Sequence, residues 1–236
     1  MPVSITAISY LAGLIAFILL TWRFFSYVRA ENTVTSRMFF YFSVSFTVFL
    51  AITAFVTLFL YESTLSLRFA VITAAFFQGL GMSFLGYMIV FLKFKSFSPK
   101  LGFAIIFLLT IISTLLAVIL SYEPVLSEAA SAIEWGVPFA ISIPRAIALF
   151  ITFIPVGYIF IQQSVTAQER HLKIRALGMG FIMFLSFAAG FVDFILEQLL
   201  NLGPVSSDYA LSVVFGILVL IIVFTQTKLP SYVKKV

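Results

Sequence analysis

The sequence predicts an all-α membrane protein with seven transmembrane helices, and three observations lead to this fold class. Hydrophobic residues occupy 62% of the 236 positions and charged residues only 10%, with a mean hydropathy of +1.18, whereas soluble proteins carry charge at about a quarter of their positions. Seven apolar stretches are each close to the roughly 20 residues that a helix needs to cross a bilayer. Lys and Arg cluster at the end of every second stretch. We expect a single domain over residues 1–236.

Each predicted span follows one apolar stretch. In chain order the spans are Ile5–Tyr27, Met38–Tyr61, Leu67–Phe91, Leu101–Tyr122, Val137–Gln162, Ala176–Asn201 and Tyr209–Thr227. The first has no basic segment before it and no small-residue cleavage site after it. We therefore expect a retained span there rather than a signal peptide.

The connection between the fourth and fifth spans, Ser121–Gly136, is the longest. Glu123 and Pro124 form a turn signal within it, and residues 127–132 are expected to form one or two helical turns that cap the outer face. Residues 228–236, after the last span, are too few for an output domain. We therefore expect any downstream signal to pass through a protein partner in the membrane or the cytoplasm.

The basic residues predict how the chain is oriented in the membrane. Of the 14 Lys and Arg residues, all except Arg68 and Arg145 fall in four clusters. Short loops rich in Lys and Arg stay on the cytoplasmic side, so the N-terminus is predicted outside and the C-terminus inside. We expect a multi-pass protein of the cell membrane, in this case a prokaryotic plasma membrane. The clusters are Arg23, Arg29 and Arg37; Lys93, Lys95 and Lys100; Arg170, Lys173 and Arg175; and Lys228, Lys234 and Lys235.

The first three and the last three helices share orientation and spacing, which suggests a 3+1+3 internal duplication. A shift of 138 positions aligns Glu31 with Glu169 and Arg37 with Arg175 in matching loops. Two charged matches also arise by chance. Duplication is therefore a hypothesis that superposition of the two halves tests.

Three ionisable residues inside the predicted spans form the candidate site: Arg145, Asp193 and Glu197. Such residues are costly in a membrane and usually face partners or water. At the helical rise per residue, Arg145 lies about 14 Å below the outer surface and Asp193 about 12 Å below it. Asp193 and Glu197, at spacing i, i+4, share one helix face. We expect the three charges to converge and to hold a ligand, an ion or a proton.

The alternative is a buried ion pair between Arg145 and Asp193 that locks the fifth helix to the sixth and holds no ligand. The surplus carboxylate keeps the functional interpretation open, because two carboxylates beside one arginine leave a titratable group. In the fifth helix, Pro144 and Pro155 remove backbone hydrogen bonds and predict kinks. These kinks are candidates for a hinge, with plain packing as the alternative.

The third predicted helix offers polar residues for the same site. Gln78, Ser83 and Tyr87 are candidates to line a cavity, and hydrogen bonding between helices is their alternative role. Gly79 and Ser83 form a small-xxx-small pair, which predicts a close approach of another helix.

Composition argues against several other classes of protein. The chain has no cysteine and one histidine, His171, so no metal site and no cofactor are expected. No set of nucleophile, base and orienting group is visible, and we expect no enzymatic activity. The net charge of +5 is attributed to the topology clusters and to attraction to an anionic inner leaflet. No nucleic-acid partner is expected.

Three seven-helix families fit the residues poorly. Microbial rhodopsins need a retinal-binding lysine inside the seventh helix, and Tyr209–Thr227 contains none. The SWEET sugar transporters share the 3+1+3 spacing, but their Pro-Gln or Pro-Asn type of dipeptide is absent. Hydrolases of the ceramidase type need several metal-binding histidines, and this chain has only one.

The basic loop Arg170–Arg175 leads directly into Ala176, Leu177 and Gly178. In this feature and in its helix pattern over nearly the whole chain, the protein resembles the seven-helix sensor region at the N-terminus of some bacterial histidine kinases. The resemblance implies a sensor, although no kinase domain follows the last span.

The leading hypothesis is a receptor-like or sensor-like membrane protein with a polar site in its outer half. The second is a small-solute or ion/proton-coupled transporter whose halves rock about that site, and the third is a structural subunit of a membrane complex. A cavity closed toward the cytoplasm favours a receptor, a polar path on both sides of Arg145 favours transport, and a filled bundle favours the structural role.

Overall fold

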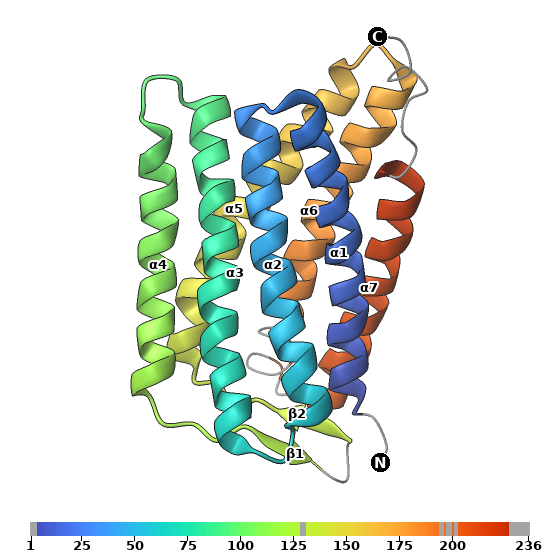
Figure 1. Cartoon of the computed structure of the whole chain (residues 1–236). Helices are drawn as coiled ribbons and strands as arrows, with labels where there is room; N and C mark the ends of the chain where they lie inside the picture. The colour runs from blue at the N-terminus through green and yellow to red at the C-terminus, as the bar shows by residue number, and fades with distance from the viewer. Residues whose placement is uncertain (1–3, 128–130, 194–195, 197–199, 201–202, 227–236) are drawn as a thin grey trace.

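The computed structural model describes residues 4–127, 131–193, 196, 200 and 203–226, apart from the side chain of Asp193. Over these residues the chain forms seven helices, all long and apolar enough to span a membrane, which confirms the predicted fold class (Figure 1). The helices are α1 (Ile5–Glu31), α2 (Val34–Phe59), α3 (Thr64–Lys93), α4 (Pro99–Ile119), α5 (Phe139–Thr166), α6 (Arg170–Asp193) and α7 (Pro204–Gln226).

Polar caps, rather than the apolar stretches, set several helix ends. The hydroxyls of Ser4, Thr33 and Ser63 accept hydrogen bonds from amides in the first turns of α1, α2 and α3, at 3.1–3.2 Å. Asn32 follows α1 with a left-handed φ of 45°, a conformation that Asn tolerates better than most residues. The predicted spans end where the apolar residues end, whereas the helices continue into the polar residues beyond. Most helices are therefore about one turn longer than the predicted span at one end.

The helices close into a ring, and α4 stands outside it. The first and last helices, α1 and α7, pack against each other, and α5 contacts α3 as well as α6. The fourth helix lies against α3 and α5 at one edge of the bundle (Figure 1). It exposes Ile105, Leu108, Ile112 and Leu115, as a helix that faces lipid does.

An aromatic layer fills the bundle near the middle of α1, α2 and α5. It consists of Phe17, Phe42, Phe46 and Phe153, each at most 4% exposed. Phe17 stacks on Phe46 with ring centroids 5.1 Å apart, and Phe153 meets Phe42 and Phe46 edge-on at 5.7 and 5.8 Å. Offset and edge-to-face pairs are the favoured aromatic geometries. The layer separates the two halves of the bundle.

Helices α3 and α4 approach closely, as the small residues of α3 predict. A β-carbon on Gly79 would collide with the side chain of Thr110 in α4. Two turns further along α3, a β-carbon on Gly86 would lie 2.7 Å from the carbonyl oxygen of Gly102. Only glycine fits at these two positions without a shift of one helix.

The connection between α4 and α5 contains a β-hairpin, so the predicted helical turns are wrong. Strand β1 (Val125–Ser127) pairs antiparallel with β2 (Ala132–Glu134), and Leu126 lies opposite Ile133. Residues 128–130 of the predicted turns lie outside the described part. Pairing places Ile133 in an apolar cluster with Val56 and Leu67, against which Leu126 also packs. This burial favours strands over exposed helical turns.

The hairpin connects α4 to α5, but hydrogen bonds attach it to α1 and, through Thr6, to α7. The Ile5 amide donates to the Ser131 carbonyl at 3.0 Å, and the Ile133 amide donates to Thr6 Oγ1 at 2.9 Å. Thr6 Oγ1 in turn donates to the carboxylate of Asp208 at 2.5 Å. Asp208, predicted in a loop, lies inside α7 and is 3% exposed. A buried relay thus joins hairpin, α1 and α7.

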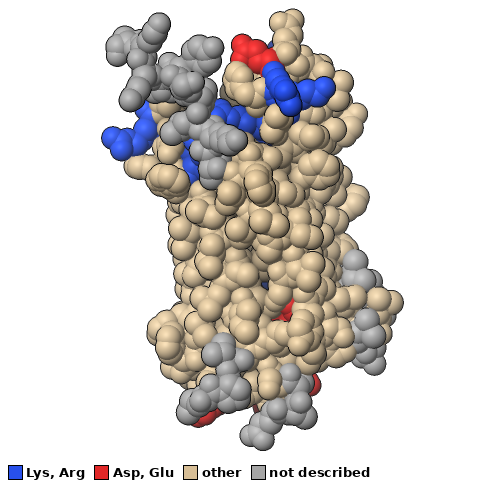
Figure 2. Space-filling model, turned by 90° about the vertical axis from the view of Figure 1, so that its right-hand side faces the viewer, with Lys and Arg blue, Asp and Glu red and all other residues tan. Residues whose placement is uncertain are grey.

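The two ends of the bundle differ in charge. We call the end that carries β1 and β2 the hairpin end, and the opposite end the basic end. Lys and Arg gather at the basic end (Figure 2), and the N-terminus lies at the hairpin end (Figure 1). Among the described residues, Arg68 and Arg145 are the exceptions. The Arg68 guanidinium donates to the carbonyls of Val118 and Leu120 at the end of α4, and Arg145 lies in the hairpin half of the bundle. The cluster Lys228, Lys234 and Lys235 lies outside the described residues. A cytoplasmic basic end remains a prediction of the positive-inside rule.

Candidate functional site

Arg145 crosses from α5 to α3 inside the hairpin half of the bundle. Its Nε and Nη2 donate to Oε1 of Gln78 at 3.2 and 2.7 Å. Gln78 is 5% exposed, and α3 and α5 are in contact because α4 stands outside the ring. Hydrogen bonds to a charged group are among the stronger ones in proteins. The pair therefore fixes the direction of the Arg145 guanidinium.

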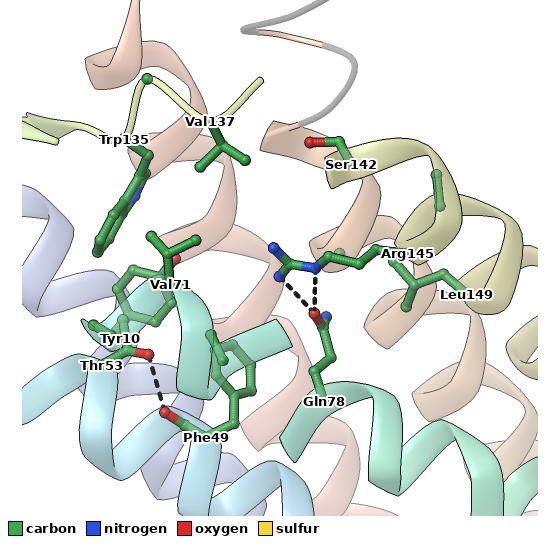
Figure 3. Close-up of a pocket in the computed structure, with 15 residues that line it drawn as sticks. Tyr10, Phe49, Thr53, Val71, Gln78, Trp135, Val137, Ser142, Arg145 and Leu149 are labelled. Atoms are coloured by element: carbon green, nitrogen blue, oxygen red, sulfur yellow. Dashed lines mark hydrogen bonds between the residues drawn. The ribbon is translucent and has the colours of Figure 1, made fainter. Parts of the chain in front are cut away.

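That guanidinium points into a cavity of about 250 Å³ (Figure 3). Residues 135–137, which follow β2, form the roof, and Gln78 lies on the opposite side of the guanidinium (Figure 3). Tyr10 and Trp135 meet edge-on in the wall, with ring centroids 6.0 Å apart. The lining consists of Tyr10, Phe49, Thr53, Ala70, Val71, Ala74, Gln78, Trp135, Gly136, Val137, Ser142, Arg145, Ala146, Leu149 and Gly190.

A smaller inner lobe of about 60 Å³ continues from the cavity toward the aromatic layer. It shares Arg145 and Gln78 with the main cavity and reaches Phe17 and Phe46. Ser186 of α6 also lines this lobe, and its buried hydroxyl has no hydrogen-bond partner within the described structure. A buried hydroxyl without a partner costs about 1–3 kcal/mol. The lobe therefore offers a polar contact to a bound group or a water molecule.

Beside the roof, the guanidinium of Arg68 lies over the aromatic ring of Tyr122. The Arg68 guanidinium carbon lies 5.2 Å from the centroid of the Tyr122 ring. Tyr122 is 7% exposed and belongs to an apolar cluster against which Trp135 and Val137 pack. Burial raises the pKa of the Tyr122 phenol, and the positive charge of Arg68 opposes that rise. This cluster supports the roof from the α3 and α4 side.

The structure brings only some of the predicted site residues together. Arg145 and Gln78 meet, whereas the side chain of Asp193 and the whole of Glu197 lie outside the described residues. Convergence of these two carboxylates on Arg145 therefore stays a prediction. Ser83 and Tyr87 do not belong to the lining of either cavity.

Ser83 and Tyr87 have contacts of their own. The Ser83 hydroxyl donates to the Gly79 carbonyl of its own helix at 2.8 Å, and Tyr87 stacks on Phe91. Pro144 and Pro155 both lie inside the continuous helix α5. Pro144 immediately precedes Arg145, so any bend at this proline would move the guanidinium. Their role as a hinge stays a prediction.

Sequence reasoning missed Tyr10, Thr53, Ser142 and Ser186 as lining residues. Single hydroxyls in apolar helices usually bond to carbonyls of their own helix, as Thr53 does with Phe49 at 3.0 Å, so they gave no signal. Trp135, in the connection before α5, was not predicted to line the site, and it turns inward over the cavity (Figure 3).

The described lining of the site combines a guanidinium, an amide, hydroxyls and aromatic faces, as small-molecule sites do. Across the described residues, no group of three or more His, Cys, Asp or Glu residues is placed to hold a metal ion. In comparisons with known proteins, no family model matches the chain, and no curated protein matches it.

Proposed function

We propose that this chain is a receptor-like or sensor-like membrane protein that holds a small organic anion in the cavity at Arg145. The observation that carries the proposal is a roofed cavity of about 250 Å³ into which the fixed guanidinium points. A structural ion pair needs no such space. The proposal keeps the sequence-based hypothesis of a polar site and gives the site a location, walls and a size.

The lining indicates the class of ligand. Guanidinium groups bind carboxylates with matched hydrogen-bond geometry, and Tyr10, Phe49 and Trp135 offer aromatic faces to an apolar body. An apolar cavity of about 150 Å³ accepts benzene, so the main cavity has room for a molecule of the size of benzoate. We therefore assign a carboxylate with a small, flat, apolar body as the best-fitting ligand.

A receptor fits the described structure better than a transporter does. The inner lobe ends at Phe17 and Phe46, which belong to the aromatic layer. Phe42 and Phe153 complete that layer and are fully buried. A solute at Arg145 would have to pass these packed rings to reach the basic end. The resemblance to sensor regions of bacterial histidine kinases agrees with binding without passage.

In this proposal the carboxylates of Asp193 and Glu197 regulate the site. Asp193 and Glu197, if they approach Arg145 as their spacing predicts, compete with a ligand carboxylate for the guanidinium. Binding would then release α6 from α5, and the prolines of α5 would let the two helices move. The signal would reach the basic end through α5 and α6, which contact each other.

Tryptophan fluorescence provides a direct test. The chain has two tryptophans: Trp135 lines the cavity and Trp22 is 64% exposed on α1. In the Trp22→Phe variant, Trp135 is the only tryptophan and reports on the cavity. We expect benzoate to change its emission saturably, and the neutral isostere benzamide to act at least tenfold more weakly, since each 1.4 kcal/mol corresponds to a factor of about ten.

Two further variants, each in the Trp22→Phe background, complete the test. Arg145→Met should abolish the response to benzoate, whereas Asp193→Asn should strengthen it by removing a competing carboxylate. Loss of all responses in Asp193→Asn would instead indicate a cationic ligand or a proton. Equal responses of the Arg145→Met variant and its parent would rule out this site.

A further inference from the structure

At the opposite end of the bundle, Arg23 of α1 is buried, and two of its three guanidinium nitrogens lack a hydrogen-bond partner among the described residues. The residue is 5% exposed, and its Nε and Nη2 atoms are buried and donate no hydrogen bond to any described residue. An arginine cannot shed its charge, and a buried charge without a partner costs several kcal/mol. The positive-inside rule accounts for a basic residue near this end, but it does not account for one that is buried.

The two unpartnered atoms form one edge of the guanidinium. Nε–H and the outer N–H of Nη2 point in the same direction, parallel to each other, and this edge is the fork that carboxylates and phosphates accept in a bidentate manner. Arg145 uses the same two nitrogens to hold Gln78. Arg23 therefore presents the same edge with no acceptor on it.

The guanidinium of Arg23 turns toward the basic end. Its central carbon lies 4.5 Å from the centroid of the Tyr27 ring, one helical turn further along α1. Contact with the Tyr27 ring holds the guanidinium and leaves the buried Nε and Nη2 edge without an acceptor. Arginine side chains near helix ends turn in this way to bring the charge to the membrane interface. Tyr27 lies four residues before the end of α1, about 6 Å along the helix axis.

Helical spacing places Arg23 on the side of α1 that faces α7. Ser9 and Gly13, which lie on the same i, i+3/i+4 stripe, contact Ser212 and Phe215 of α7. The two helices run in the same direction, so the end of α7 at Gln226 lies at the level of Arg23. On the lipid side, the adjacent Trp22 is 64% exposed, as an aromatic residue of the interfacial belt is.

We propose that Arg23 is the centre of a binding site for a phosphate-type oxyanion at the basic end, on the α1 side that faces α7. A phosphate or phosphodiester group supplies two acceptor oxygens to this buried edge and neutralises the charge. Its source is either the headgroup of an anionic lipid or free phosphate. The site is independent of the cavity at Arg145, which lies beyond the aromatic layer.

The test uses the full chain in nanodiscs of phosphatidylcholine, with and without phosphatidylglycerol. Thermal unfolding and the number of lipids retained in native mass spectrometry are measured for the wild type, Arg23→Met and Arg29→Gln. Arg29 is the matched control, because it lies on the same helix and over an aromatic ring, Phe25, but is exposed. In a separate arm, inorganic phosphate is compared with chloride at equal ionic strength in discs without phosphatidylglycerol.

We expect phosphatidylglycerol to raise the melting temperature of the wild type and of Arg29→Gln, and to have no effect on Arg23→Met. Retention of phosphatidylglycerol should fall by about tenfold or more in Arg23→Met, since a charge-assisted hydrogen bond contributes about 1.5–3 kcal/mol. Stabilisation by inorganic phosphate alone would identify free phosphate as the source.

Arg23→Lys covers the case in which Arg23→Met does not fold. Lysine keeps the charge but lacks the two-pronged edge, so this variant should fold and retain phosphatidylglycerol less well than the wild type. Equal responses of the wild type, Arg23→Lys and Arg29→Gln to both probes would overturn the proposal. So would the absence of any response to either probe in the wild type.

Discussion

Arg145 of α5 donates two hydrogen bonds, at 3.2 and 2.7 Å, to a single oxygen of Gln78 in α3. The two residues are 67 positions apart in the chain. Helix α4 lies between them in sequence, but it stands outside the ring, so α3 and α5 are in direct contact. The pair both braces two helices and aims the guanidinium into the cavity.

Replacement of Gln78 by Leu should destabilise the protein by about 1.5–3 kcal/mol, because it removes the acceptor from a charged donor within the bundle. Denaturation in mixed micelles measures the free energy of unfolding. Gln162→Leu is the control, because the exposed Gln162 also accepts a hydrogen bond from a cation, Lys93. An exposed pair of this kind contributes under about 1 kcal/mol. Equal losses in the two variants would argue against a bracing role for Gln78.

Labelling of introduced cysteines should distinguish a receptor from a transporter, and the chain has no cysteine of its own to react. Ala146 lines the cavity. In Ala146→Cys we expect a membrane-impermeant, anionic thiol reagent to react from the hairpin end and not from the basic end. Ala117→Cys, at a position that is 0% exposed, should not react from either side. Reaction of Ala146→Cys from both sides would favour transport.

Replacement of Thr6 by Val should loosen the hairpin. It removes both the acceptor of the Ile133 amide and the donor to Asp208. We expect hydrogen exchange at Ile133 to accelerate roughly tenfold, which corresponds to the loss of a buried hydrogen bond. Thr73→Val is the control, because the Thr73 hydroxyl bonds only to carbonyls of its own helix. Unchanged exchange at Ile133 would show that the Thr6 hydroxyl does not hold the hairpin in place.

Alkaline pH should destabilise the roof through Tyr122. Burial raises the pKa of this phenol when the protein is folded, whereas in the unfolded chain it ionises at about pH 10. Above that pH the unfolded chain binds fewer protons than the folded protein, so the stability of the folded protein falls as the pH rises toward the raised pKa. The difference in melting temperature between the wild type and Tyr122→Phe should therefore change above about pH 10. A difference that is constant with pH would contradict this account.

The helices were predictable because an apolar run of membrane length has few alternatives to a helix. The ends of the helices were less predictable, since Thr33 and Ser63 cap helices at positions that hydropathy alone does not mark. The hairpin was missed because its strands are three residues long and depend on Thr6, which is distant in sequence.

For the site, helix depth predicted Arg145 inside the bundle, and the structure places its half-buried side chain in the lining of the main cavity. Gln78 of α3 was predicted to line a cavity but not to bind Arg145, and the two meet because the position of α4 outside the ring lets α3 and α5 come into contact. The predicted contacts of Arg145 with Asp193 and Glu197 stay a prediction. For Arg23, the sequence predicted only a basic residue of the cytoplasmic side, because it belongs to one of the four basic clusters. Its burial depends on the packing of the helices and is seen only in the structure.

The relay from Ile133 through Thr6 to Asp208 also bears on how the protein is made. Thr6 and Asp208 are 202 positions apart, so α1 enters the membrane long before its partner on α7 has been synthesised. Until then the hydroxyls of Thr6 and Ser9 have no α7 group to bind. The packing of α1 is therefore complete only once α7 has been made, and a chain that stalls before this helix would expose the α7-facing side of α1 to quality-control proteases of the membrane.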